Sequence, residues 1–189
     1  MGTAYSQTFA ATGGAGTPYT WTVTSGSSSL TAVGLSLSSA GVLSGATPVA
    51  GTASFTVQAK DSAGNTASAT FSVTIDAKVA ITTTSPLPTG VVGAAYSQTF
   101  AATGGTGTPY TWTVTTGSTN LTAVGLSLSS AGVLSGATPI AGSATFTVQA
   151  KDSGGNTASA SFSVTVNASL TITTTSLPSG CLLYTSRCV

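Results

Sequence analysis

Apolar and polar side chains alternate with a period of two along residues 54–76, which read SFTVQAKDSAGNTASATFSVTID. The alternation runs in two stretches on either side of a turn, DSAGN. It predicts a long β-hairpin with one apolar face and one hydroxylated face. The apolar face must be buried against a second sheet, so a β-sandwich is expected.

The same hairpin pattern occurs again over residues 145–167, TFTVQAKDSGGNTASASFSVTVN. Trp21 and Trp112 lie 91 residues apart, and so do Phe71 and Phe162. This spacing is longer than the roughly 20 to 50 residues of solenoid units. It indicates two small domains in tandem, each with its own core.

Shorter runs predict the remaining strands. Residues 79–84, VAITTT, predict an edge strand with a kink where Pro86 and Pro88 follow, and residues 96–102 predict a second segment of the same edge. Residues 34–38 and 42–44 predict two short strands around a turn at Gly41.

About seven short strands are predicted in each repeat, which is typical of an immunoglobulin-like sandwich. No window shows helical spacing, so essentially no helix is expected, and residues 25–29, SGSSS, are interpreted as a flexible loop. The predicted core of the first repeat is apolar throughout: Phe9, Trp21, Leu35, Leu37, Leu43, Phe55, Val57, Phe71, Val73 and Ile75.

These patterns divide the chain into four parts. Residues 1–76 are interpreted as a repeat that lacks its opening strand, because Met1 stands where the second repeat has Val92. Residues 77–167 form a complete repeat, and residues 168–180 match the opening strand of a third. Residues 181–189, CLLYTSRCV, leave the pattern and are interpreted as foreign sequence; both cysteines lie there, so neither is expected to staple a domain.

The composition argues against several classes of partner. Only 4% of the residues are charged, against about 25% in an ordinary globular chain. With a net charge of +1, the surface has no field that would attract nucleic acid or an anionic membrane. No run approaches the ~18 apolar residues of a membrane span, and no secretion signal is visible in this fragment.

Catalysis is not expected. The chain has no histidine and only three acidic residues, so it offers no convincing acid–base pair, and its many hydroxyl groups have no base to activate them. No cofactor is predicted. The weak candidates for a metal site are calcium ligands in the two hairpin turns, namely Asp61, Asn65, Asp152 and Asn156. The alternative is that each aspartate accepts backbone N–H groups within its own turn while Gly64 takes a positive φ.

Four motifs occur in the same order in both repeats: AYSQTFAATGG, TPYTWTV, GLSLSSAGVLSGATP and FTVQAKDSAGN, the last with one substitution in the second repeat. They resemble the immunoglobulin-like domains found in tandem in large bacterial surface proteins, a group related to dystroglycan-type cadherin-like domains. The resemblance implies secreted or cell-surface proteins whose repeats act as spacers, as adhesion modules or as accessory parts beside enzymes. Cadherins bind calcium at domain junctions through several acids, whereas the junction here, Asp76-Ala77-Lys78, has one.

The leading hypothesis is therefore a non-enzymatic structural and adhesion spacer of a repetitive bacterial extracellular or cell-surface protein. Its expected partners are the neighbouring repeats and a cell-surface protein or polysaccharide. The rival hypothesis is a carbohydrate-binding accessory module of a secreted enzyme, in which Tyr5, Tyr19 or Tyr96 would stack on sugar. A third hypothesis is self-association, in which residues 170–175 add to the unpaired edge of the first repeat in another molecule.

Overall fold

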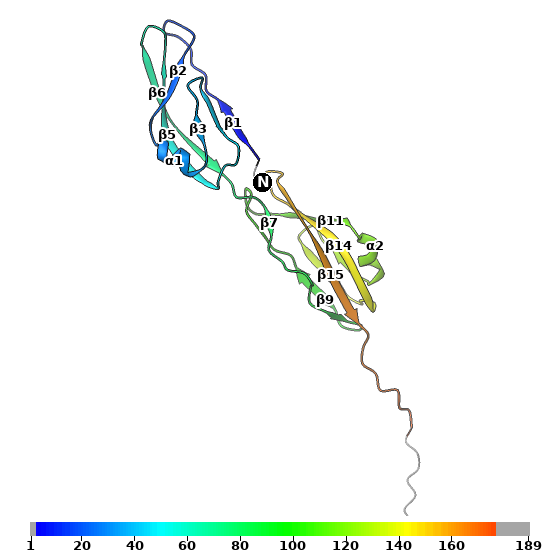
Figure 1. The fold of residues 1–189 in the computed structure, drawn as a ribbon. Coiled ribbons are helices and arrows are strands. Elements are labelled where there is room, and N and C mark those ends of the chain that lie inside the picture. The colour runs from blue at the N-terminus through cyan, green and yellow to red at the C-terminus, as the bar shows by residue number, and fades with distance from the viewer. Residues whose placement is uncertain (1–2, 177–189) are drawn as a thin grey trace, which may run out of the picture.

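The chain folds almost entirely into β-strands, which confirms the predicted all-β class. The computed structural model describes residues 3–176, and the strands of the two repeats form two groups placed end to end (Figure 1). Over these residues no sheet combines strands of both repeats. The segment expected to be foreign, residues 181–189, lies outside the described part of the chain.

The first repeat is a sandwich of two three-stranded sheets. The predicted hairpin forms β5 (Gly51–Lys60) and β6 (Thr66–Ile75), which pair antiparallel so that Phe55 lies opposite Phe71. On its other side β5 pairs with β2 (Thr20–Ser25). The facing sheet has the order β1 (Tyr5–Thr8), β4 (Val42–Gly45) and β3 (Ser36–Leu37).

The second repeat has the same plan and three additional short strands. Its larger sheet has the order β11 (Thr111–Thr116), β14 (Gly142–Lys151), β15 (Thr157–Asn167) and β8 (Gly90–Val91). The facing sheet has the order β12 (Ser127–Leu128), β13 (Val133–Gly136) and β9 (Tyr96–Thr99). A two-stranded sheet joins β7 (Ala80–Ile81) and β10 (Ala102–Thr103).

Residues 79–91, called the covering segment below, explain the additional strands. They pair first with β10, bend through the two prolines and then join β15 in parallel as β8. Proline has no backbone N–H, so the chain leaves the ladder there, and the predicted kinked edge strand is confirmed. The expectation that residues 96–102 continue the same edge is wrong for β9, which pairs with β13 instead.

Two short helices contradict the expectation of essentially no helix. They are α1 (Ser27–Ala32), whose first three residues belong to the expected flexible loop, and α2 (Ser118–Ala123). A six-residue helix shows too little of the 3.6-residue period to be recognised from sequence. Each helix buries one leucine, Leu30 or Leu121, and neither could cross a membrane.

The covering segment also makes the core of the second repeat less exposed to solvent than that of the first. Phe162 in β15 is 3% exposed, whereas Phe71, its counterpart in β6, is 39% exposed. Trp112 is buried, whereas Trp21 is only half-buried against the core. Phe55 and Val57 are buried as predicted, but the expectation that Phe71 is a core residue is wrong, because no segment among residues 3–76 covers β6 as residues 79–91 cover β15.

Candidate functional site

The turn of the first hairpin brings two of the calcium candidates together. The Asp61 carboxylate accepts hydrogen bonds from the backbone N–H of Asn65 at 2.7 Å and from its side-chain amide at 2.8 Å. A third bond comes from the backbone N–H of Ala15 at 2.8 Å. Gly64 has a φ of 90°, as the turn requires. The carboxylate therefore ties the hairpin turn to the loop before β2.

The second hairpin repeats this arrangement. Asp152 accepts from the backbone N–H of Asn156 at 2.7 Å, from its side-chain amide at 2.9 Å, and from the Thr106 N–H at 2.9 Å. The side-chain amide of Asn156, followed by the Thr106 N–H, lowers the pKa of Asp152 to about 2. The pKa of Asp61 is lowered mainly by the Ala15 N–H and then by the Asn65 amide.

The chemistry of these turns favours a structural role. Calcium takes six to eight oxygen ligands, whereas the residues described contain no group of three or more His, Cys, Asp or Glu side chains that could hold a metal. In both turns the carboxylate oxygens already accept N–H groups, which a metal would have to displace. The sequence pointed to the turns but did not show that the N–H groups of Ala15 and Thr106 bind the aspartates. The one signal for such a loop was the Thr-Gly-Gly motif, which comes directly before Ala15 in the first repeat and before Thr106 in the second.

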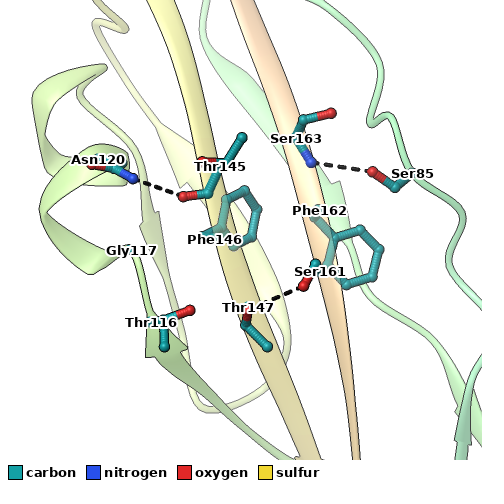
Figure 2. A pocket seen from close by; sticks show the side chains of 10 residues that line it. All are labelled: Ser85, Thr116, Gly117, Asn120, Thr145, Phe146, Thr147, Ser161, Phe162 and Ser163. Atoms are coloured by element: carbon teal, nitrogen blue, oxygen red, sulfur yellow. Dashed lines mark hydrogen bonds between the residues drawn. The ribbon is translucent and has the colours of Figure 1, made fainter.

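A shallow groove of about 550 Å³ lies on the second repeat beside the N-terminus of α2 (Figure 2). Figure 2 shows that Asn120 donates to the Thr145 carbonyl oxygen at 2.9 Å on one side, and that the Ser163 N–H donates to the Ser85 hydroxyl at 3.2 Å on the other. The lining consists of hydroxyl, amide and backbone groups around the two phenylalanines, and it contains no titratable side chain. This groove can form hydrogen bonds but offers no acid–base chemistry.

The tyrosines proposed for sugar stacking are not free platforms. Tyr96 is buried, and its hydroxyl donates to the Pro88 carbonyl oxygen at 3.0 Å; burial raises its pKa. Tyr19 is half-buried and donates to the Gly13 carbonyl oxygen at 2.7 Å, while Tyr5 is half-buried against the first core. Within residues 3–176 the most exposed aromatic side chain is Phe71, at 39%.

The junction between the repeats is held by the second repeat. The Gly105 N–H donates to the Ala77 carbonyl oxygen at 2.5 Å. A cleft of about 800 Å³ lies beside it and is lined by Asp76 and Lys78 from the linker and by Tyr5 and Asn156 from the repeats. This lining contains a single carboxylate, whereas calcium takes six to eight oxygen ligands.

The comparisons with known proteins agree on the type of fold. A family model described as "Putative Ig domain" matches residues 1–76 and 78–167. A comparison with curated proteins finds no match. The titin I-band fragment I67–I69 has 17% sequence identity to this chain and a TM-score of 0.50, over 88% of this chain and 61% of its own length.

Other solved structures are similar over shorter shares of their own length. Extracellular cadherin domains 3–6 of protocadherin gamma B2 match 81% of this chain and 43% of theirs, with 15% identity and a TM-score of 0.45. Extracellular domains 3–5 of Drosophila OTK match 71% of this chain and 46% of theirs, with 13% identity and a TM-score of 0.46. The chain thus spans less than two thirds of each of these three structures, and the likeness is one of fold.

Proposed function

The chain belongs to the "Putative Ig domain" family through both of its repeats, and on that premise we propose that it is a non-enzymatic structural and adhesion module of a longer repetitive protein. We place that protein outside the cell or at its surface, in a bacterium. The observation that carries the proposal is the end-to-end placement of two closely similar sandwiches joined by a short linker (Figure 1). Such a chain acts as a spacer, because it holds the parts of the protein on either side of it a fixed distance apart.

The surface chemistry supports this role. The outer face of the long hairpins is a ladder of cross-strand hydroxyl pairs, such as Thr56 with Thr70 at 3.0 Å and Thr147 with Ser161 at 3.2 Å. These hydroxyl groups keep the face hydrated and carry no charge. The two hairpin aspartates already accept N–H groups. The remaining acid of the chain, Asp76, lies in the junction cleft beside Lys78 and without a second carboxylate, so the described residues offer no pair of carboxylates for acid–base catalysis.

As part of this proposal, residues 1–76 and 77–167 are two domains that fold separately. The sheet pairings support the boundary, because those of the first repeat end at Ile75 and those of the second begin at Ala80. Residues 168–180 would open a third repeat. A chain with one more copy of residues 77–167 inserted after Asn167 should therefore be longer by one sandwich, about 35 to 40 Å for strands of this length. Small-angle X-ray scattering measures this increase, and an unchanged maximum dimension would contradict the spacer role.

Location is tested in the organism that encodes the chain. An antiserum against residues 77–167 should lose its signal when protease is added to intact cells, while a cytoplasmic marker survives. A signal that disappears only after lysis would contradict an extracellular position. The same intact cells stained without protease provide the positive control.

A further inference from the structure

The first repeat has an exposed strip that its counterpart in the second repeat does not have. We call this strip the open seam; it consists of residues 10–12 and 71–73. In the second repeat the equivalent residues, 101–103 and 162–164, are in contact with the covering segment. The difference is visible at Phe71, which is 39% exposed where Phe162 is 3% exposed.

The contacts of the covering segment define what a seam of this kind binds. Val79 is buried in the core at 2% exposure, and Ile81 packs against that core. The Thr82 N–H donates to the Ala101 carbonyl oxygen at 2.8 Å, and the Ala101 N–H donates to the Thr83 hydroxyl at 2.8 Å. The occupant is thus an extended segment with two apolar side chains followed by hydroxylated residues.

Further along, the segment crosses β15 at the groove of Figure 2. The Ser163 N–H donates to the Ser85 hydroxyl at 3.2 Å, and the Leu87 N–H donates to the Ser163 carbonyl oxygen at 2.9 Å. The buried Leu87 side chain is part of the core cluster that contains Phe162. In the first repeat the residue that corresponds to Ser163 is Ser72, which lies on the open seam next to Phe71.

The chain carries a second segment of the same chemistry. Residues 170–176 read LTITTTS, and residues 79–85 read VAITTTS, 91 positions earlier. Leu170 and Ile172 are 100% and 90% exposed. Residues 170–176 pair with no strand among residues 3–176, so two apolar side chains and a run of β-branched residues face solvent.

The segment is held away from the open seam of its own chain. It follows β15, whose 11 residues span about 35 Å, and it leaves at the end of the second repeat far from the first (Figure 1). The residues between Asn167 and Leu170 reach only about 10 Å. Residues 170–176 therefore cannot reach the open seam of their own chain, and they can bind it only in another molecule.

We propose that residues 170–176 of one copy bind the open seam of the first repeat of a second copy. The register follows from the second repeat: Leu170 takes the place of Val79, and Ile172 lies opposite Ala11, as Ile81 lies opposite Ala102. The Thr173 N–H donates to the Ala10 carbonyl oxygen, and the Ser72 N–H donates to the Ser176 hydroxyl. Binding buries both donor side chains and places Ser176 over Ser72, the neighbour of Phe71.

The two surfaces in this contact differ, so each copy provides residues 170–176 at one end and its open seam at the other. Such a head-to-tail contact forms an open chain of copies unless the rotation closes it into a ring. Copies joined in this way continue the end-to-end order of the repeats. The inference rests on the two repeats of this chain and does not depend on the proposed cellular location.

Light scattering after size exclusion, over a concentration series of the 189-residue chain, tests the proposal. The mass should rise with concentration in the parent chain, and Ile172→Asp should reduce it to the monomer; Ile172 is exposed, so this variant should fold normally. Ile140→Asp changes another exposed apolar residue, 56% exposed, and should associate like the parent. A constant monomer mass in the parent, or equal association in Ile172→Asp, would overturn the proposal.

The register is tested separately by disulfide trapping in a background where both native cysteines are serine. Thr12 corresponds to Thr103, which pairs with Ala80, so Thr12 should lie opposite Thr171 of the donor. The variant Thr12→Cys/Thr171→Cys should form linked dimers and longer species under mild oxidation. The control, Ser68→Cys/Thr171→Cys, places the acceptor cysteine on an exposed residue of β6 outside the seam. Equal yields of linked species from the two variants would overturn the register.

Discussion

The Ser163 N–H donates to the hydroxyl of Ser85 at 3.2 Å, joining two residues 78 positions apart in the chain. This bond fixes the covering segment across β15 at the point where Phe162 is buried. The first repeat retains Phe71 and Ser72 at the matching positions but has no such bond among its described residues. The two repeats therefore provide a comparison of one sandwich with and without its cover.

The two phenylalanines should differ in their contribution to stability. Phe162→Ala should lower the free energy of unfolding of the second repeat by about 3 to 5 kcal/mol, because it removes a fully buried ring. Phe71→Ala should cost the first repeat about 1 to 2 kcal/mol, since that ring is already partly hydrated. Thermal unfolding of the two variants measures both values. Equal losses would contradict the difference in burial.

The covering segment should itself stabilise the second repeat. Leu87 is buried, and Leu87→Ala should lower the free energy of unfolding by about 2 to 5 kcal/mol. The loss should be confined to the second repeat, which hydrogen exchange resolved by peptide can report. Ile140→Ala, at an exposed position, is the control and should change the stability by less than about 0.5 kcal/mol.

Stability should depend on acid through Asp152. Its pKa of about 2 in the folded state lies below the unfolded value of about 3.9. The carboxylate therefore contributes stability that is fully present above pH ~4 and is lost as the pH falls toward 2. The melting temperature of the second repeat should fall over this window, and Asp152→Asn should show a smaller fall. An identical pH profile in the variant would contradict the role of the carboxylate.

Glycine at the turn beside each tryptophan should be required for two reasons. Gly132 has a φ of 85°, and an added Cβ would lie 2.7 Å from the Trp112 ring. Gly132→Ala should destabilise the second repeat by about 2 kcal/mol or more, through backbone strain together with displacement of the indole ring. Gly93→Ala is the matched control, because Gly93 has a φ of 87° but open space around it, and it should cost about 1 kcal/mol.

Calcium should leave the chain unchanged. The carboxylates of the two hairpin turns already accept N–H groups, so a metal would have to compete with those bonds. The melting temperature should be the same in millimolar calcium and in a chelator. A rise with calcium that disappears in Asp61→Asn and Asp152→Asn would identify the turns as metal sites.

The hairpins, the β-class and the short strands around Gly41 could be predicted from sequence, because each is encoded by a local pattern of alternation and turn residues. The helices could not, since six residues carry one buried leucine and almost no periodicity. The exposure of Phe71 could not be predicted from sequence either. Its local pattern matches that of Phe162, and burial there depends on a segment that lies far away in sequence.

The bonds made by the aspartates were foreseen only within their own turns. The partners Ala15 and Thr106 lie 46 residues before their aspartates, and a backbone N–H has no residue-specific signature. The role of Ser85 was missed for the same reason. What sequence did provide was the 91-residue offset, which allows each position of one repeat to be compared with its equivalent in the other.

The parallel pairing of β8 with β15 has a consequence for a chain under tension. Gly90 lies opposite Val166 and Val91 opposite Asn167, and the Val92 N–H donates to the Asn167 carbonyl oxygen at 2.9 Å. The chain enters the second repeat just before β7 and leaves it after β15, at the opposite end (Figure 1). A pull between these ends draws the two strands past each other, so their hydrogen bonds are loaded in shear and must break together. The second repeat is thus built to resist extension at the end where the force leaves it.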